Sequence, residues 1–503
     1  MRYWLYWIWI ILLLPAGNVL GADSVLSALP NPGFEDGRTE DSRFIPDGWS
    51  PSSEACETTA PGYRSRHALL VKGHGEDDAV WISAPVSVQP GAWYEFSFWG
   101  KKALDSQGGS AVSGPTFANQ DIWLTNDWKN YTVVFRVPEN HAEARFRLGH
   151  WRVNGTLFFD TADLIPVQPI YTRREGLVLG QGERVQDASY TALHDLDAPG
   201  GNGCRFLQSS TAGFNTGRLL FGAQTQVTYR HEIPGNRLMA ATVELNLNYR
   251  TSGVCRVSAR SDKADWMELG AFSELNTHSL TFPEALLPAA WLEIRLEGTA
   301  DDDGCYFQVN RYRMKGTLEQ PLRALEGKTR FLRVSNTDPS TRVVIEQVGD
   351  PKPGLDTELV MSVENPGKEK SLFTARIDTS GPSSQDVFTY PFSVNAGETA
   401  TVRIPYSLRE TGRHQVYIQV FRPMEVNVFR GGLSLDVSFL YAADFGERLD
   451  SGTGGSVWWC PATYKVSLNR PVPRRLGHAA WLSAARGEFE PVQIVLRPEK
   501  AVS

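Results

Sequence analysis

Hydrophobic and polar residues alternate one by one in short stretches along most of the chain, as in 93–99, 130–137, 144–151 and 243–249. A period of two is typical of a β-strand with one buried face, whereas the 3.6-residue period of helices is nearly absent. Gly, Pro, Asn and Asp separate these stretches and indicate turns. The pattern predicts an all-β protein with several β-sandwich, jelly-roll and immunoglobulin-like domains in tandem.

A chain of 503 residues is too long for one domain, and the composition of the alternating segments changes along it. The predicted segments are a signal peptide at 1–22, a carbohydrate-binding-like jelly roll at 24–167, a second β-sandwich at 170–318, an immunoglobulin-like spacer at 330–439, and the incomplete start of a hydrolase-associated β-sandwich at 441–503.

The first 22 residues have the composition of a secretion signal. Arg2 provides a short positive start, residues 4–15 are almost wholly apolar, and small residues precede a cleavage site before Ala22. The alternative is a retained membrane anchor, although the apolar run is shorter than the ~20 residues that span a bilayer. No later segment is apolar enough to span, so we expect a secreted, periplasmic or cell-surface protein with no integral membrane span after signal removal.

Charge and cysteine spacing narrow the classes of partner. The net charge of -7 is mild, and the absence of a basic run argues against nucleic acid. The five cysteines show no CxxC spacing, which argues against zinc. Among Cys204, Cys255 and Cys305 one pair could form a disulfide; alternatively, the cysteines are small buried residues.

Strand parity places three side chains that suit a sugar away from the predicted core. If Phe98 faces the core, Trp99 lies on the opposite face of its strand, and if Leu148 faces the core, Arg147 and Trp151 lie opposite. An indole ring packs against the C–H groups of a pyranose, and a guanidinium hydrogen-bonds its hydroxyls. We therefore predict a carbohydrate-binding surface of Trp99, Arg147 and Trp151. The alternative is that the tryptophans pack under a loop or against the second domain.

Other conspicuous segments are interpreted as loops. The Gly- and Ser-rich stretch 105–119 is predicted to be a long loop of the kind that borders binding sites. The acidic run 301–304 could bind a cation or form a solvated turn.

Residues 29–164 resemble the jelly-roll carbohydrate-binding modules attached to xylanases and glucanases. The motifs that carry the resemblance are 31–35 (NPGFE), 46–49 (PDGW), 128–132 (WKNYT) and 157–164 (LFFDTADL). The resemblance implies a structural calcium ion between the first and last strands, held by Glu35 and Asp160, with Thr161 where the family often has a second acid. The alternative is that each carboxylate caps a turn.

Residues 457–466 (VWWCPATYKV) and 484–498 (AARGEFEPVQIVLRP) resemble the start of the β-sandwich that precedes the barrel in family 123 glycoside hydrolases. The resemblance covers about 441–503 and implies substrate-assisted hydrolysis of N-acetylhexosaminides by an adjacent Asp and Glu in the barrel. No part of a barrel is present, so we assign no catalytic residue. Residues 488–490 are interpreted as structural.

Two hypotheses of function follow. The first is an exported, non-catalytic front part of a glycoside hydrolase-like protein that binds or positions a polysaccharide or other glycan. This hypothesis predicts a longer gene product with a catalytic barrel. The second is a cell-surface structural or adhesive protein of stacked sandwiches with no enzymatic activity.

Overall fold

The computed structural model describes residues 29–40, 43–338, 341–441, 446–449, 454–466, 470 and 472–498. The predicted signal peptide at 1–22 lies outside the described residues. The all-β prediction is confirmed, because every regular element in the described ranges is a strand apart from three 3₁₀ helices of three residues. These short helices are η1 (Glu284–Leu286), η2 (Pro423–Glu425) and η3 (Phe439–Tyr441).

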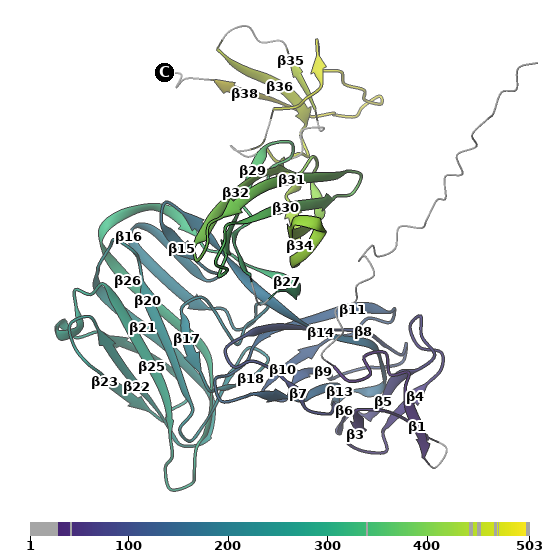
Figure 1. Cartoon of the computed structure of the whole chain (residues 1–503), viewed down its shortest axis with the longest axis vertical. Helices are drawn as coiled ribbons and strands as arrows, with labels where there is room; N and C mark the ends of the chain where they lie inside the picture. Colours follow the sequence, from purple (N-terminus) through teal and green to yellow (C-terminus); the bar gives the residue numbers. More distant parts are fainter. Residues whose placement is uncertain are drawn as a thin grey trace, which may run out of the picture.

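The first sandwich, at the lower right in Figure 1, consists of two facing sheets. Its strands are β1 (Gly37–Glu40), β2 (Arg43–Pro46), β3 (Trp49–Pro51), β4 (Cys56–Thr59), β5 (Ala68–His74), β6 (Asp78–Ser83), β7 (Val86–Ser87), β8 (Trp93–Lys102), β9 (Ser110–Pro115), β10 (Ala118–Ile122), β11 (Lys129–Arg136), β12 (Glu143–Ala144), β13 (Phe146–Trp151) and β14 (Asn154–Arg174). One sheet has the order β10-β9-β13-β6-β3, and the other joins β11, β8, β14, β5 and β4. Phe96, Phe98 and Phe146 fill the space between them and are fully buried.

The stretch predicted as a long loop at 105–119 is largely strand, so that prediction is wrong. All six residues of β9 (Ser110–Pro115) are buried, and β10 begins at Ala118. β9 is hydrogen-bonded to β13 on one side and to β10 on the other. Small side chains here allow a central strand to lie beneath larger neighbours, and composition alone does not distinguish this from a flexible loop.

The second sandwich lies at the left in Figure 1. Its elements are β15 (Leu177–Leu179), β16 (Glu183–His194), β17 (Leu207–Ser210), β18 (Gly213–Asn215), β19 (Leu219–Gly222), β20 (Gln226–Glu232), β21 (Leu238–Ser252), β22 (Val254–Ser261), β23 (Met267–Phe272), β24 (Thr277–Thr281), β25 (Trp291–Thr299) and β26 (Tyr306–Glu326), with η1 after β24. One sheet has the order β17-β20-β25-β22-β23, and β16, β19, β21 and β24 join the opposite sheet around β26. All five cysteines of the chain are free.

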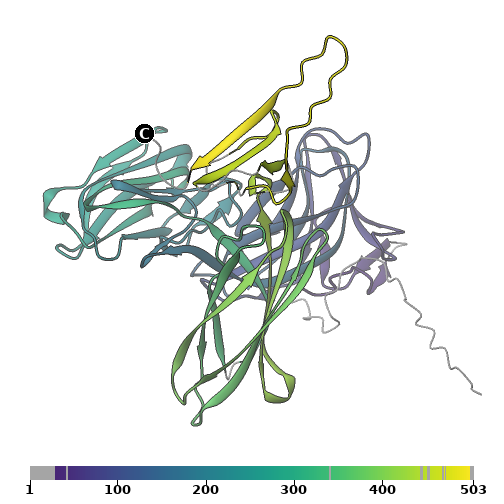
Figure 2. The same cartoon turned by 90° about the horizontal axis from the view of Figure 1, so that it is seen from above.

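The third sandwich packs above the other two in Figure 1 and points away from them in Figure 2. Its strands are β27 (Thr329–Thr337), β28 (Arg342–Gln347), β29 (Asp356–Glu364), β30 (Ser371–Ser380), β31 (Gln385–Val394), β32 (Thr399–Ser407), β33 (Gly412–Arg422) and β34 (Val426–Val437). Ile418, Val420 and Met361 are among its fully buried side chains.

A small four-stranded sheet ends the described chain. Its strands are β35 (Glu447–Leu449), β36 (Gly455–Pro461), β37 (Leu476–Gly477) and β38 (Val492–Pro498), in the order β37-β35-β36-β38. The strand predicted from the alternation in 492–497 is therefore confirmed as β38. Trp458 and Cys460 are buried on one face, whereas Ile494 and Leu496 are 54% and 71% exposed.

Two sheets continue from one sandwich into the next. β10 pairs in parallel with β18, which joins the first sandwich to the second through Asn119 and Asn215. β14 pairs with β8 and then with β27, which joins the first sandwich to the third. The predicted limit between 167 and 170 lies inside β14. The predicted domain limits thus fall where a strand changes its partners, and the domain assignment stays a prediction.

Candidate functional site

The structure does not bring the three predicted sugar-binding residues onto one surface. Arg147 and Trp151 lie on β13, and Trp99 lies on β8 in the opposite sheet of the first sandwich. Figure 1 shows β9, β13 and β6 in one layer and β8, β11 and β14 in the other. Parity correctly predicts that each side chain points out of the core. A sandwich has two outer faces, however, one on each sheet. The expectation of a single shared surface is therefore wrong.

Strand β13 separates its side chains cleanly between the core and the outside. Phe146, Leu148 and His150 are buried between the sheets, whereas Arg147 and Trp151 point outward. Trp151 is 49% exposed, and the guanidinium of Arg152 lies 4.7 Å from the centre of its ring. One indole face is thus occupied by a neighbour while much of the ring remains in solvent.

Sequence reasoning missed a second tryptophan on the same outer face. Trp123 follows β10 and is 73% exposed, although Leu124 beside it is buried. Ile122, the last residue of β10, pairs with Ala111 on one side of β9, and Trp151 pairs with the adjacent Ser110 on the other side. The two tryptophans therefore flank one strand at a backbone separation of roughly 10 Å. The signal was available in the alternation of Trp123 with buried apolar neighbours.

We call the outer side of β10, β9, β13 and β6 the paired-tryptophan face. The residues that define it are Asp78, Val80, Ile82, Ser110, Val112, Gly114, Asn119, Asp121, Trp123, Arg147 and Trp151. Small residues occupy the strand between the two tryptophans, and they are buried even though they point outward. The rings are thus the prominent side chains of this row.

Arg147 is the cation of the paired-tryptophan face. Its Nη2 donates to Asn119 Oδ1 at 3.2 Å and to the carbonyl oxygen of Pro115 at 3.4 Å. Its Nε is buried and has no hydrogen-bond partner. Burial lowers the pKa of the Arg147 guanidinium, against the opposing effect of Asp121. Arg147 is therefore a positioned donor with unused hydrogen-bonding capacity.

Trp99 belongs to an aromatic group on the opposite outer face, which we call the stacked face. Its ring lies 4.0 Å from that of Tyr63 at an interplanar angle of 21°, and Trp128 lies 5.7 Å from the same tyrosine. The ammonium of Lys101 lies 5.0 Å from the ring centres of both Trp128 and Phe158. Tyr63 thus stacks on one face of Trp99, and the ammonium of Lys101 lies over Trp128.

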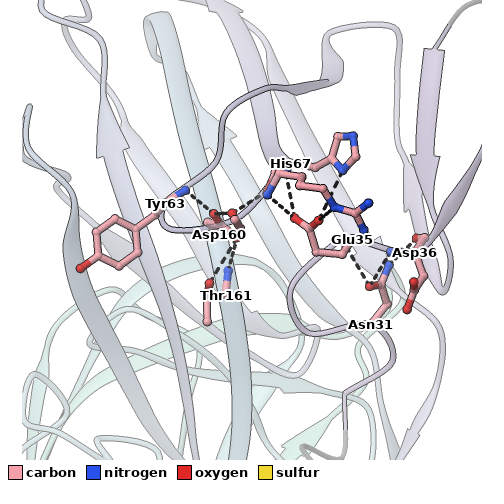
Figure 3. Close-up of polar contacts among 9 residues, drawn as sticks. Asn31, Glu35, Asp36, Tyr63, His67, Asp160 and Thr161 are labelled. Atoms are coloured by element: carbon pink, nitrogen blue, oxygen red, sulfur yellow. Dashed lines mark hydrogen bonds and ion pairs between the residues drawn. The ribbon is translucent and has the colours of Figure 1, made fainter. Parts of the chain in front are cut away.

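The two acids that the resemblance assigns to calcium both hold the segment 62–67. Glu35 Oε1 accepts hydrogen bonds from the backbone amides of Arg66 and His67 at 2.8 Å, and Oε2 lies 2.7 Å from Arg66 Nε (Figure 3). Burial alone would raise the pKa of Glu35, but the hydrogen bonds from His67 and Arg66 outweigh it and lower the pKa. Glu35 thus acts as the anionic partner of this segment.

Asp160 fastens the other end of the same segment. Its Oδ2 accepts from the Tyr63 amide and the Ser65 hydroxyl, each at 2.5 Å, and its Oδ1 accepts from the Thr161 amide at 2.7 Å (Figure 3). Asp160 is fully buried, and burial raises its pKa despite these hydrogen bonds.

These donor sets do not fit a calcium ion. Calcium requires six to eight oxygen ligands, whereas the carboxylates of Glu35 and Asp160 are occupied by N–H and O–H donors. Within the described ranges, no group of three or more His, Cys, Asp or Glu side chains could hold a metal ion. Calcium stays a prediction from the resemblance, and the described geometry offers the alternative in which both acids fasten turns.

The chain matches solved structures, but no family model or curated protein. The CBM22-1–CBM22-2 tandem domain of Paenibacillus barcinonensis Xyn10C is 11% identical with a TM-score of 0.22, over 57% of this chain and 96% of that chain. A Bacteroides uniformis β-glucuronidase is 10% identical with a TM-score of 0.18, over 45% of this chain and 28% of that chain. Likeness at this level carries no argument about function, and the resemblance to family 123 stays a prediction.

Proposed function

We propose that the chain is a glycan-binding, non-catalytic part of a carbohydrate-active protein and that the paired-tryptophan face is its binding surface. The observation that carries the proposal is the pair of exposed indoles, Trp123 and Trp151, on either side of one strand of small residues. Two rings in one row provide apolar platforms for the C–H faces of a sugar chain that lies across the strands.

Arg147 complements the two rings chemically. Its guanidinium carries five N–H donors. The two hydrogen bonds that it makes within the protein both come from Nη2. Asn119 and Asp121 on β10 provide amide and carboxylate groups on the same outer side. Sugar hydroxyls both donate and accept hydrogen bonds, so this mixture suits a polyol. An apolar protein partner would leave the Arg147 Nε, which is buried and has no hydrogen-bond partner, unsatisfied.

The acids of this face are too far apart to hydrolyse a glycosidic bond. Asp121 lies on β10 and Asp78 on β6, and β9 and β13 lie between them. Three strand spacings separate their backbones by roughly 14 Å. Glycosidases need two carboxyl groups about 5 to 9.5 Å apart. A binding role therefore accounts for this arrangement better than catalysis.

The proposal includes export to the cell surface, the periplasm or the medium, where polymeric glycans occur. Its basis is the composition of residues 1–22, with Arg2 ahead of an apolar run. In the described residues no helix is long and apolar enough to cross a membrane. A binding part would raise the effective concentration of a linked catalytic domain at its substrate.

Affinity electrophoresis of the whole chain in gels that contain soluble polysaccharides tests the proposal. We expect at least one polysaccharide to retard the chain and the Trp123→Ala and Trp151→Ala variants each to reduce that retardation. The matched control is Trp481→Ala, because Trp481 is 80% exposed but lies outside the first sandwich. Retardation that both face variants retain in full would contradict the proposal.

A structural or adhesive role is the second candidate. The observation that favours it is the continuity of two sheets across three sandwiches, through the β10–β18 and β14–β27 pairings. Such continuity joins the sandwiches through backbone hydrogen bonds, as a structural support requires. An array of neutral and acidic glycans that shows no binding by the whole chain would favour this second role.

A further inference from the structure

A second candidate surface lies on the second sandwich, on the outer side of the sheet β17-β20-β25-β22-β23. Along β25 the residues Leu292, Ile294 and Leu296 are buried in the core. The alternate positions of this strand therefore point outward, and they are occupied by Trp291, Glu293, Arg295 and Glu297. We call this the Arg295 face.

Two arginines of this face share one buried acid. Arg230 Nη1 lies 2.9 Å from Glu293 Oε1, and Arg260 Nη2 lies 2.6 Å from Glu293 Oε2. Glu293 is 1% exposed, and the guanidinium of Arg230 lies 4.4 Å from the ring centre of Trp291. Arg230 also pairs with Glu232, whose Oε2 lies 3.0 Å from Arg230 Nη2, so two acids compensate the two arginines.

Arg295 differs from these neighbours in having no such partner. Its guanidinium lies 4.2 Å from the ring centre of Trp266, and its Nε is buried without a hydrogen-bond partner. Among the described residues, no carboxylate lies within ion-pairing distance of it. A buried donor without a partner costs stability. The fold therefore holds a positioned cation with one buried N–H group that has no hydrogen-bond partner.

The cross-strand neighbours of Arg295 carry hydroxyl groups. Thr228 on β20 and Ser258 on β22 pair with Arg295 directly from its two sides. Side chains at directly paired positions have Cβ atoms about 4.5 to 5.5 Å apart. The row Thr228, Arg295 and Ser258 thus brings a guanidinium and two hydroxyls together, with the ring of Trp266 over the guanidinium.

We propose that this row binds a carboxylate group and that its carrier is the uronic acid residue of an acidic glycan. A guanidinium matches a carboxylate with two parallel N–H···O bonds, which hold the anion in one orientation. The hydroxyls of Thr228 and Ser258 are donors for the remaining lone pairs. The inference that a carboxylate binds here is argued from the second sandwich alone. The choice of a sugar as its carrier rests on the proposed function.

Glu297 supplies an internal check. It lies two residues from Arg295 on the same outer side of β25, but it forms no ion pair with it. A carboxylate ligand must compete with this nearby negative charge. Removing the charge should therefore strengthen binding, whereas removing the guanidinium should weaken it.

Calorimetric titration of the whole chain with an oligogalacturonate tests the proposal, with a neutral oligosaccharide of equal length as the comparison probe. We expect Arg295→Met to weaken binding of the acidic oligomer about tenfold to a hundredfold. Thr228→Val should weaken it less, and Glu297→Gln should strengthen it. Arg413→Met, on the third sandwich, is the control for loss of an exposed arginine and should leave binding unchanged. Increased salt should weaken binding, because the pair is partly solvated.

Four outcomes would overturn the proposal. Unchanged binding of the acidic oligomer by a folded Arg295→Met variant removes the carboxylate site, and so does Glu297→Gln without any gain. Equal competition by acetate removes the sugar as carrier. Binding of the acidic oligomer that is lost in Trp123→Ala and Trp151→Ala but kept in Arg295→Met assigns it to the first sandwich. Conversely, loss in Arg295→Met alone supports this site even if the paired-tryptophan face binds nothing.

Discussion

The first sandwich has aromatic side chains on both of its outer faces, and the two faces use them differently. On the stacked face, Trp99 lies against Tyr63 at 4.0 Å and both are half-buried. On the paired-tryptophan face, Trp123 and Trp151 are 73% and 49% exposed and flank a strand of small residues. Aromatic content alone is thus a poor guide to binding. What matters is whether a ring face is still free once the chain has folded.

The largest effect is expected from releasing the segment that carries Tyr63 to the stacked face. Asp160→Ala removes the acceptor of the Tyr63 and Thr161 amides and leaves polar groups unpaired in a buried position. We expect the first sandwich to lose about 3 kcal/mol of unfolding free energy. Thermal unfolding monitored by calorimetry measures this loss. A change below about 0.5 kcal/mol would show that the segment is held by other contacts.

Truncation of the stacked face itself should have the next largest effect. Trp99→Ala removes a ring that packs on Tyr63, and because the side chain is half-buried we expect about 2 kcal/mol of destabilisation. Retardation by polysaccharide should persist below the new melting temperature. If Trp99→Ala abolished retardation while the protein stayed folded, the stacked face and not the paired-tryptophan face would be the binding surface.

The complementary change on the paired-tryptophan face should separate binding from stability. Trp151→Ala removes a ring that is about half exposed, so we expect the unfolding free energy to change by at most about 0.5 kcal/mol. Retardation should fall by a factor that corresponds to about 0.5 to 1.5 kcal/mol of lost stacking. Melting temperature and gel mobility of the same preparation report the two effects independently. A large fall in melting temperature would identify Trp151 as a structural residue.

Acid should weaken the packing around His150, between the two sheets of the first sandwich. His150 is fully buried, its Nε2 lies 3.0 Å from the carbonyl oxygen of Lys72, and its Nδ1 accepts from the Val153 amide at 3.4 Å. Burial lowers the pKa of His150, against the opposing effect of the Lys72 carbonyl. The unfolded state therefore binds a proton more readily, so the stability from this group is present above about pH 6.5 and declines as the pH falls below it.

Hydrogen exchange of the peptide 143–151 measures this decline locally. A local probe is required because His194 and His231, which are buried in the second sandwich, also titrate in acid, with pKa values lowered by burial to about 4 and about 3. A protection factor that falls between neutral pH and pH 5 is the expected result, measured against the intrinsic rate, which itself slows as the pH falls. Protection that stays constant across this window would contradict the assignment of His150 as a buried neutral base.

The smallest effect is expected from a chelator. Glu35 and Asp160 are satisfied by donors of the segment 62–67, so treatment with EDTA should leave the melting temperature of the first sandwich unchanged. The control is the same treatment followed by added calcium. A melting temperature that falls with EDTA and recovers with calcium would support the metal implied by the resemblance and would require a rearranged segment.

The alternation of side chains predicted the strands well but could not predict which strands share a sheet. β8, β11 and β13 lie where the pattern indicates them, and the side chains expected in the core are buried. Parity is defined relative to one strand only, so it cannot separate Trp99 from Trp151, which lie in different sheets. The pairing of β13 with β9 and β6, and of β8 with β14, depends on long-range contacts that no local window contains.

Other features were hidden for different physical reasons. β9 is a buried strand with the composition of a loop, so a propensity argument misassigns it. Trp123 was overlooked because it lies one residue beyond β10, although its alternation with buried Leu124 was visible. The lack of a partner for Arg295 depends on the reach of the surrounding acids, which spacing along the chain does not determine.

The parallel pairing of β10 with β18 also constrains how a long polymer could be held. Because this pairing crosses from one sandwich to the next through backbone hydrogen bonds, the two sandwiches meet without a flexible tether. The outer faces of the two sandwiches therefore keep a fixed distance and angle relative to each other. A ligand that engages both must match that span, since avidity is lost when the geometry forbids simultaneous contact. Selectivity for chain length and charge spacing would then arise from the frame rather than from either face.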